Sequence, residues 1–276
     1  MIMEFVTKNR IIIAILLTII FSILCCRSKI IKYTMEGFDN QLKLRLYVIN
    51  MEKDKERYQK LLKYYNYSDL TALSLHRYNA VIGKTVSPEK WLSNDALSEL
   101  KLIEKNGFRT HHHSLTRGGL GCFLSHYNLA KQLLQDNSVD AYLIFEDDTT
   151  MLSSTYDQIL KSIHEAPSDW DMLLFYTIRA VGRSENETFN KLKSFWGMNC
   201  YILKKSGAKK FVDEVNKTRI DGQVDCYLSR MIQQKKMNIY STKTHFVSSN
   251  SKDTNIQTLL KPQQNIDPYD YKGYRV

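Results

Sequence analysis

Short apolar runs alternate with amphipathic stretches along most of the chain. The run at 44–50 (LRLYVIN) is rich in β-branched residues and predicts a buried strand. The stretch at 54–65 places apolar side chains at helical spacing and predicts an amphipathic helix. By the same criteria, we expect a strand and a turn at 75–83, strands at 141–145, 171–176, 199–203 and 237–241, and helices at 88–107, 118–135, 156–163, 208–215 and 224–232. This alternation predicts an α/β protein with a mainly parallel sheet and helices on both faces.

An uncharged apolar segment at 11–26 (IIIAILLTIIFSILCC) precedes these elements. As a helix it would be roughly 24 Å long, which fits an anchor in a thin membrane or an uncleaved signal. A cleavable signal peptide is the alternative, although no Ala-x-Ala-like site follows the segment. We therefore expect a short tail at 1–10, a membrane anchor at 11–26, a stem at 27–41 and a globular domain at 42–276.

The predicted anchor implies a single-pass membrane protein with a type II-like arrangement, in an endomembrane lumen or a host-derived membrane. Basic residues lie on both sides of the segment, so the positive-inside rule leaves the orientation open. The net charge of +10 is spread along the chain rather than gathered in one patch. Attraction to anionic membranes or nucleotide phosphates remains open, but we expect no nucleic-acid partner. The cysteines show no metal-ligand spacing, and we interpret Cys122, Cys200 and Cys226 as buried thiols.

Three adjacent acids, Glu146, Asp147 and Asp148, follow the predicted strand at 141–145. Ligands of parallel sheets bind beyond the carboxyl ends of the strands, which is where these acids lie. Because strand side chains alternate between faces, Glu146 and Asp148 are able to point the same way. A divalent cation such as Mn²⁺ or Mg²⁺ would offset their repulsion and bridge substrate phosphates. The alternative interpretation is an acidic turn that caps the next helix.

The acids belong to a series of motifs that keep a fixed order along the chain. The motifs are YVINME at 47–52 followed by Arg57, RYNAVIG at 77–83, LTRGGLGCFLSH at 115–126, EDD at 146–148, WD at 170–171, YILKKSGAKK at 201–210 and VD at 224–225. Together they strongly resemble the family 25 glycosyltransferases, which include lipopolysaccharide and procollagen galactosyltransferases. Gly119 stands where that family usually has Glu, and Gln223 stands where it often has Pro.

This resemblance implies a GT-A-like, Rossmann-type fold and a UDP-sugar donor, UDP-galactose or UDP-glucose. It implies metal-dependent, inverting transfer of the hexose to a hydroxyl group of a glycan or protein acceptor. The residues that it places at the nucleotide-sugar site are Asn50, Arg57, Arg77, Ala80, Val81, His126, Glu146 and Asp147. The metal ligands would be Asp148 and Glu146, with His245 as a third.

Inverting transfer also needs a base to deprotonate the acceptor hydroxyl. The VD motif makes Asp225 the candidate, and Asp221 is the alternative. Several of these residues have a simpler interpretation: Arg57 as a solvated helix residue, His126 as a structural hydrogen-bonding group and Asp225 as a helix N-terminal residue.

Two other functions remain open from the sequence. Clustered acids on a basic chain also fit a metal-dependent nuclease or phosphotransferase. The departures at Gly119 and Gln223 suggest instead a catalytically inactive glycan- or nucleotide-binding protein on a transferase scaffold.

Overall fold

The computed structural model of the chain describes residues 42–109 and 114–249. Eight strands form one sheet in the order β2-β1-β3-β8-β5-β9-β7-β6, and two short strands pair separately. The strands of the large sheet are β1 (Leu44–Asn50), β2 (Leu75–Asn79), β3 (Ala141–Glu146), β5 (Met172–Leu174), β6 (Arg179–Ser184), β7 (Phe189–Trp196), β8 (Cys200–Lys204) and β9 (Ile239–Thr242). The small pair consists of β4 (Thr149–Met151) and β10 (Val247–Ser249).

Most strands of the large sheet point in one direction. β2, β1 and β3 pair in parallel, as do β5 and β9. β8 is antiparallel to both β3 and β5, and β7 is antiparallel to both β9 and β6. Six of the eight strands are therefore aligned, with β8 and β7 reversed between them. The expectation of a mainly parallel α/β sheet is confirmed.

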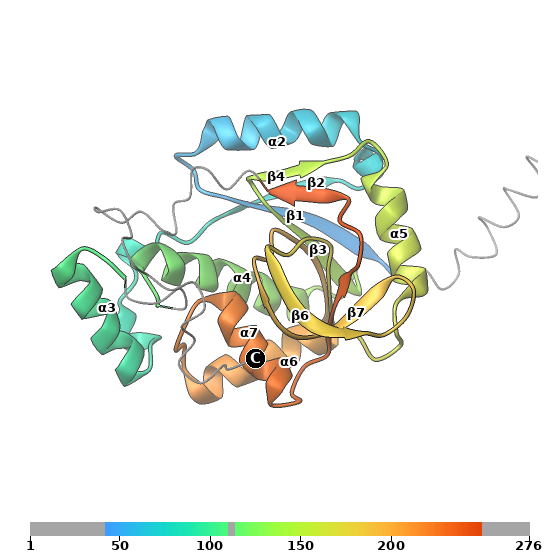
Figure 1. Cartoon of the computed structure of the whole chain (residues 1–276). Helices are drawn as coiled ribbons and strands as arrows, with labels where there is room; N and C mark the ends of the chain where they lie inside the picture. The colour runs from blue at the N-terminus through green and yellow to red at the C-terminus, as the bar shows by residue number, and fades with distance from the viewer. Residues whose placement is uncertain (1–41, 110–113, 250–276) are drawn as a thin grey trace, which may run out of the picture. The chain divides into compact units, whose positions relative to one another are not determined.

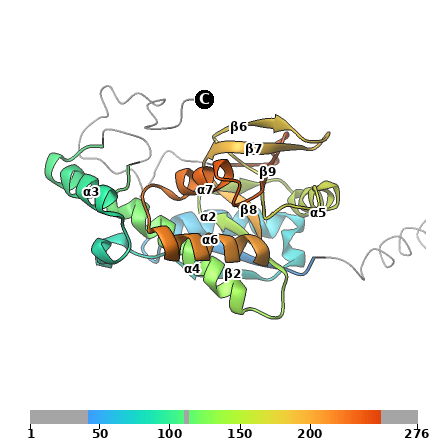
Figure 2. The ribbon, with the colours of Figure 1, turned by 90° about the horizontal axis from the view of Figure 1, so that it is seen from below.

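Six α-helices accompany the sheet in the described part of the chain: α2 (Lys55–Tyr67), α3 (Asn94–Asn106), α4 (Arg117–Gln135), α5 (Thr155–Glu165), α6 (Lys205–Thr218) and α7 (Val224–Gln233). α4, α6 and α7 gather on one side of the sheet, whereas α2 lies on the other side (Figures 1 and 2). Three short 3₁₀-helices complete the set: η2 (Asp69–Ala72), η3 (Gly83–Thr85) and η4 (Pro88–Lys90).

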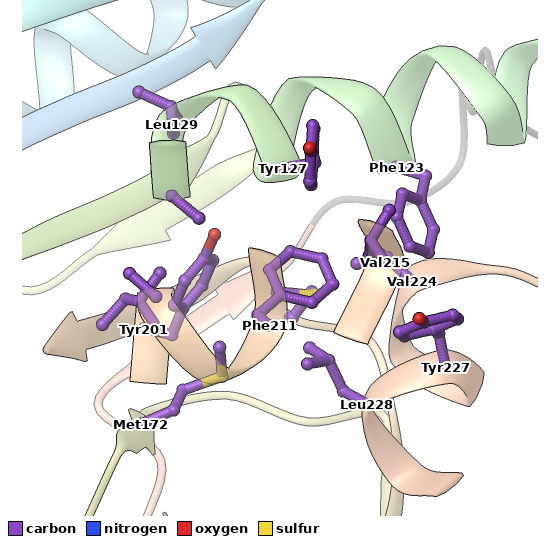
Figure 3. Close-up of a cluster of buried hydrophobic side chains, with 14 of the residues drawn as sticks. Phe123, Tyr127, Leu129, Met172, Tyr201, Phe211, Val215, Val224, Tyr227 and Leu228 are labelled. Atoms are coloured by element: carbon purple, nitrogen blue, oxygen red, sulfur yellow. The ribbon is translucent and has the colours of Figure 1, made fainter. Parts of the chain in front are cut away.

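The main core lies between the sheet and the helix layer of α4, α6 and α7. Phe123 of α4, Phe211 of α6 and Tyr227 of α7 meet there (Figure 3), with ring centroids 5.2–6.1 Å apart. Tyr142 and Ile144 of β3 belong to the same buried cluster, as do alternate residues of β8. The even-numbered side chains of β3 therefore face α4. Glu146, the last residue of β3, points to the same side.

Backbone contact fixes α4 against the segment that follows β2. A Cβ atom at Gly121 would lie 2.4 Å from the carbonyl oxygen of Val81 and 2.7 Å from the backbone nitrogen of Gly83. The Val81 N–H also donates to Ser125 Oγ over 2.9 Å. The motifs at 77–83 and 115–126 thus form a single packed unit that sets the position of α4.

The structure differs from the sequence predictions in three places. The predicted helix at 88–107 is two elements, η4 and α3, because Ser93 accepts a hydrogen bond from the Ala96 N–H and starts a new helix. The β6–β7 hairpin was not predicted because β6 is polar and mostly exposed. The short strands β4 and β10 carry too little apolar pattern to be recognised from sequence.

The predicted tail, membrane anchor and stem at 1–41 lie outside the described residues. Within the ranges that the structure describes, no helix is long and apolar enough to cross a membrane.

We predict that Gly121→Ala destabilises the protein by about 1–3 kcal/mol, despite the better helix propensity of Ala. The added methyl group would meet backbone atoms, which cannot move aside as a flexible side chain would. Urea unfolding of the full-length chain measures the effect. Lys131→Ala, at an exposed position of the same helix, serves as the control and should change stability by no more than about 0.5 kcal/mol. An unchanged midpoint for Gly121→Ala would contradict the close approach.

Candidate functional site

Glu146 is the last residue of β3 and continues the face of the strand that packs on α4. Its Oε1 lies 3.2 Å from Nε2 of His126, a buried residue of α4. The other ring nitrogen of His126 lies 2.7 Å from the hydroxyl of Tyr201, which belongs to β8. Tyr201 and Glu146 thus hold the imidazole from both sides. This arrangement supports both interpretations of His126, because the residue borders the acids and also makes structural hydrogen bonds.

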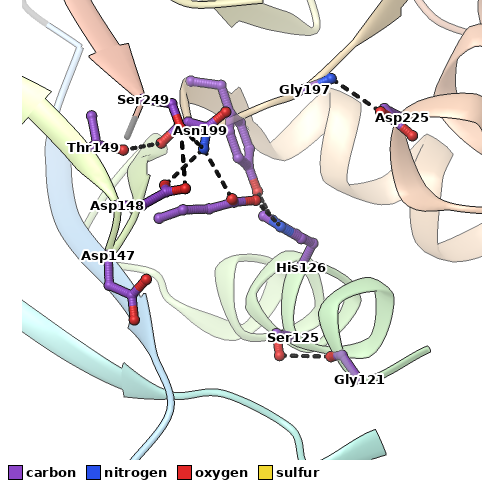
Figure 4. A network of polar contacts seen from close by, with 12 residues as sticks. Gly121, Ser125, His126, Asp147, Asp148, Thr149, Gly197, Asn199, Asp225 and Ser249 are labelled. Atoms are coloured by element: carbon purple, nitrogen blue, oxygen red, sulfur yellow. Dashed lines mark hydrogen bonds and ion pairs between the residues drawn. The ribbon is translucent and has the colours of Figure 1, made fainter. Parts of the chain in front are cut away.

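Asn199 joins two of the three acids. Its Nδ2 atom lies 3.1 Å from Oε2 of Glu146 and 2.8 Å from Oδ1 of Asp148 (Figure 4). Ser249 of β10 donates a further hydrogen bond of 3.0 Å to Oδ2 of Asp148. Glu146 and Asp148 therefore point toward a common donor, as predicted, although Asp147 and Asp148 form a turn after β3 rather than part of the strand.

The middle acid points elsewhere. Asp147 accepts a 2.6 Å hydrogen bond from Nδ2 of Asn50 at the end of β1. It also forms a 2.6 Å ion pair with Arg57 in the first turns of α2. Arg57 reaches Asp148 as well, over 3.6 Å. Figure 4 shows the Asp147 side chain turned away from Asp148. Arg57 is thus part of the acid site and is not a purely solvated helix residue.

A pocket of about 210 Å³ opens beside these acids. One wall is α2 and the other is the segment from Asp147 into β4; the lining residues are Glu56, Arg57, Lys60, Leu61, Tyr64, Asp147, Asp148, Thr149 and Thr150. The wall of α2 contributes two cations, Arg57 and Lys60, and one carboxylate, Glu56, and the opposite wall contributes two carboxylates. A pocket with both signs of charge suits an anionic ligand that arrives with a metal cation.

Burial raises the free energy of the ionised forms of Asp147 and Asp148. Burial raises the pKa of Asp147 to about 6, and hydrogen bonding from Asn50 and the charge of Arg57 oppose the shift. Burial and then the charge of Glu146 raise the pKa of Asp148, against the effects of Asn199, Arg57 and Ser249. A bound cation would relieve this cost because it favours the ionised forms.

The remaining residues of the predicted nucleotide-sugar site support Asn50 and the chain around it. Arg77 donates from Nε to Oδ1 of Asn50 over 2.9 Å, and its guanidinium lies 5.0 Å from the centre of the Tyr58 ring. The Ala80 N–H donates to the carbonyl oxygen of Asn50. Val81 contacts α4 through its N–H, as described above. Their direct contact with a donor stays a prediction.

The two candidate bases occupy different surroundings. Asp225, in the first turn of α7, is half-buried and accepts hydrogen bonds from the backbone N–H groups of Gly197 and Cys226, at 3.0 and 2.8 Å. Burial raises its pKa, to which the charge of Glu146 also contributes. Asp221 is exposed and forms an ion pair with Arg230. Asp225 lies near enough to Glu146 to feel its charge, and it also occupies the first turn of α7, as its simpler interpretation requires. The role of either residue as the base stays a prediction.

His245 is an exposed residue of the segment between β9 and β10. Its ring centroid is 5.2 Å from that of Tyr176. In the described ranges, the only group of three or more His, Cys, Asp or Glu residues with closely spaced ligand atoms is Cys122, His126 and Glu146. The role of His245 as a third metal ligand stays a prediction without support from the geometry.

The donor chemistry of Glu146 and Asp148 fits a hard divalent cation. Both are carboxylates, both are partly buried, and one amide nitrogen lies within 3.1 Å of an oxygen from each. Mg²⁺ and Mn²⁺ are commonly bound by one or two carboxylates together with substrate phosphates. These two residues are therefore sufficient for such a site if the donor supplies further oxygens.

Sequence reasoning missed Asn199 and Ser249, and it considered Tyr201 as a sugar-stacking or core residue rather than as the partner of His126. Asn199 comes directly before an apolar strand, but only the antiparallel pairing of β8 with β3 brings it beside Glu146. The Glu146 N–H donates to the Asn199 carbonyl oxygen over 2.8 Å and fixes this register. Ser249 arrives from the other end of the chain through β10.

The departures from the family pattern are accommodated locally. Gly119 lies in the first turn of α4, where its N–H donates to the capping hydroxyl of Thr116 over 3.0 Å. The side chain of Gln223 donates to the carbonyl oxygen of Ser114 over 3.4 Å.

A family profile described as "Glycosyltransferase family 25 (LPS biosynthesis protein)" matches residues 43–228. The match covers more than half of the chain and includes the acid triplet, Asn199 and Asp225. The protein belongs to glycosyltransferase family 25.

Curated relatives carry related names. A glycosyltransferase 25 family member of Anopheles gambiae is 28% identical over 177 residues, which is 61% of this chain and 28% of the relative. Human procollagen galactosyltransferase 2 is 26% identical over 188 residues, or 64% of this chain and 28% of the relative. Procollagen galactosyltransferase 1-A of Xenopus laevis is 27% identical over 208 residues, which is 71% of this chain and 31% of the relative. The chain spans about three tenths of the length of these relatives.

Solved structures show a more distant likeness. A197 from STIV aligns with a TM-score of 0.40 and 9% identity, covering 81% of this chain and 98% of that chain. S. aureus TarS 1-349 in complex with UDP-GlcNAc aligns with a TM-score of 0.39 and 13% identity, covering 78% and 60%. Likenesses at this level carry no argument about ligand or activity.

We predict that Asp147→Asn stabilises the metal-free protein at pH 8 and has little effect near pH 4. A carboxyl group whose pKa is higher in the folded state, about 6 against an ordinary 3.8, lowers stability as the pH rises between these values. The full difference corresponds to about 3 kcal/mol, which is the upper limit of the gain. The amide oxygen of the new Asn side chain is still able to accept the hydrogen bond from Asn50. Arg57 loses its ion pair with residue 147 but retains the one with Asp148.

Urea unfolding of the full-length chain with a chelator, at both pH values, measures this effect. Asp213→Asn, on the exposed face of α6, is the matched control and should change stability by less than about 0.5 kcal/mol at pH 8. A loss of stability in Asp147→Asn at pH 8 would show that the ion pair with Arg57 outweighs burial.

Proposed function

We propose that this protein is a metal-dependent glycosyltransferase that transfers galactose or glucose from a UDP-sugar to a hydroxyl group of a glycan or protein acceptor, with inversion at the anomeric carbon. The proposed domain has the GT-A type of arrangement and corresponds to residues 42–276. Membership of family 25 supports the class of reaction.

One observation carries the proposal: the acids that end β3 meet the cations of α2 at the wall of a pocket. Cleavage of the bond between sugar and diphosphate leaves negative charge on the departing UDP. Arg57 and Lys60 line the pocket and supply fixed positive charge for the phosphates. An arrangement that served only to cap α5 would not need Asn50, Arg57 and Asn199 around the acids.

Asp148 and Glu146 would hold the cation, Mn²⁺ or Mg²⁺. When bound, such a cation acts as a Lewis acid that stabilises the leaving diphosphate. Asn199 orients both carboxylates through its amide nitrogen. Asn50 and Arg57 hold Asp147 away from them, so that three acids fit at one strand end without all facing each other.

Asp225 would accept the proton of the acceptor hydroxyl. A general base works best when its pKa approaches the working pH, and burial raises the pKa of Asp225 in that direction. Its two backbone hydrogen bonds fix the carboxylate at the start of α7. The acceptor itself remains open between a lipopolysaccharide or other glycan and a protein hydroxyl.

We also propose that residues 11–26 anchor the enzyme in a membrane as a single-pass segment of type II-like arrangement. Support comes from the apolar composition of the segment alone. Extraction by detergent but not by carbonate would agree with an anchor, and release by carbonate would contradict it.

We predict that UDP-galactose or UDP-glucose raises the melting temperature of the full-length chain only when Mn²⁺ is present, because a ligand that binds the folded state stabilises it. Asp148→Asn should abolish this shift and lower UDP release about 10²–10³-fold, the usual loss for one electrostatic stabiliser. Asp213→Asn is the control and should behave as wild type. If wild type neither binds nor hydrolyses any of the UDP-sugars tested, the proposal is wrong.

We predict that Asp225→Asn lowers the rate of transfer about 10²–10⁴-fold while the KM for the UDP-sugar stays within about threefold. In the wild type, activity should fall as the pH drops through the raised pKa of Asp225, because the protonated carboxyl group cannot accept a proton.

Asp221→Asn is the matched control for this variant and should retain activity. If Asp221→Asn is inactive and Asp225→Asn is active, Asp221 rather than Asp225 is the base. Binding of the UDP-sugar by wild type without any turnover would instead support an inactive binding protein on a transferase scaffold.

A further inference from the structure

Cys122, His126 and Glu146 bring a thiol, an imidazole and a carboxylate together beside the Glu146–Asp148 pair described above, and Glu146 belongs to both groups. Cys122 and His126 lie four residues apart on α4 and therefore share a helix face. Glu146 reaches the same point from the end of β3. One ligand atom of each residue lies within 4.8 Å of the others. Two different elements thus present three potential metal ligands to one position.

The imidazole of His126 is already oriented as a ligand requires. A metal-binding histidine normally uses its second ring nitrogen for a hydrogen bond that fixes the ring. Nδ1 of His126 lies 2.7 Å from the hydroxyl of the fully buried Tyr201. Nε2 faces Glu146 at 3.2 Å. If the ring proton resides on Nδ1 and is donated to Tyr201, the lone pair of Nε2 is directed toward the carboxylate side.

The negative charge at this position also favours a cation. The charges of Glu146, Asp225 and Asp148 all add to the effect of burial on the Cys122 thiol and raise its pKa. A cation would be attracted by the same three acids. Cys122 and Glu146 are both partly exposed, which leaves a route for an ion to enter.

The kind of cation follows from the donor set. Sulfur and imidazole nitrogen favour Zn²⁺ and similar borderline metals, whereas Mg²⁺ and Mn²⁺ prefer oxygen. Three protein ligands with a fourth position left for water are typical of zinc sites that remain open to solvent.

We propose that Cys122, His126 and Glu146 form a second divalent-cation site of the zinc class. Zinc binding releases the thiol proton to solvent, and the imidazole carries its proton on Nδ1, donated to Tyr201, whichever ring nitrogen holds that proton in the metal-free protein. Glu146 is shared with the carboxylate pair, so zinc at this site withdraws Glu146 from Asp148 and inhibits transfer. The site itself is independent of the proposed function; only the inhibition depends on it.

Cobalt(II) provides a direct test, because a cobalt–thiolate bond gives a charge-transfer band in the near ultraviolet that oxygen and nitrogen ligands do not give. The full-length chain is used with Cys25 and Cys26 replaced by Ser, since two adjacent thiols would themselves bind cobalt. After removal of metals and thiol reductants, CoCl₂ alone is titrated in. We expect a band that saturates at one equivalent and disappears when ZnCl₂ is added.

Three variants in the same background assign the band. Cys122→Ser should abolish it, and Cys226→Ser, which replaces another free thiol of the described residues, should retain it. Glu146→Gln keeps the shape of the side chain but loses the anionic ligand, so the affinity for cobalt should fall at least about tenfold. Asp148→Asn should keep the band, since Asp148 is not one of the three proposed ligands. Cooperative thermal unfolding of each variant shows that it folds.

The absence of the band in the Cys25/Cys26-substituted chain would overturn the proposal. A band that persists in folded Cys122→Ser would overturn it equally. If Cys122→Ser does not fold, an unchanged cobalt affinity in folded Glu146→Gln has the same consequence. Failure of the UDP-sugar binding experiment would leave these spectra unaffected, so the two proposals are tested separately. Where transfer is measurable, Zn²⁺ should inhibit wild type but not Cys122→Ser.

Discussion

The mutual repulsion of three partly buried carboxylates at the end of β3 is the constraint around which this region is built. Each acid is held by donors from another part of the chain: Asn50 of β1 and Arg57 of α2 on Asp147, Asn199 and Ser249 on Asp148, and His126 on Glu146. Unpaired charges at such burial would neutralise rather than remain ionised. The elements that supply the donors therefore have to converge on one strand end.

The position of helix α4 is central to how these elements come together. Its close backbone approach to the turn at Gly83 leaves little freedom in its position, and His126 is placed relative to β3 as a result. The motif at 77–83 thereby influences the acids although it does not touch them. Residues of the family pattern that look independent along the sequence are joined here by packing, and this explains why glycine appears in both motifs at the point of contact.

Glu146 lies at the border between two kinds of chemistry. On one side, Asn199 links it to Asp148 and to an environment of oxygen ligands suited to a cation that accompanies a diphosphate. On the other side it meets the imidazole and the thiol of α4. A single carboxylate cannot be a full ligand for a cation on both sides at once. In the absence of a cation, one oxygen of Glu146 contacts Asn199 and the other contacts His126.

The sequence by itself determined which segments are buried and where the acids fall. The strand at 44–50 has the predicted bounds, the acids fall at the end of a strand, and Glu146 and Asp148 point toward one donor, as predicted. Only the tertiary structure decided that β8 is reversed against β3, which places Asn199 beside the acids, and that β10 returns to supply Ser249. The physical reason is that hydrophobic periodicity reports burial of a local segment, whereas partners distant in sequence are selected by packing across the whole sheet.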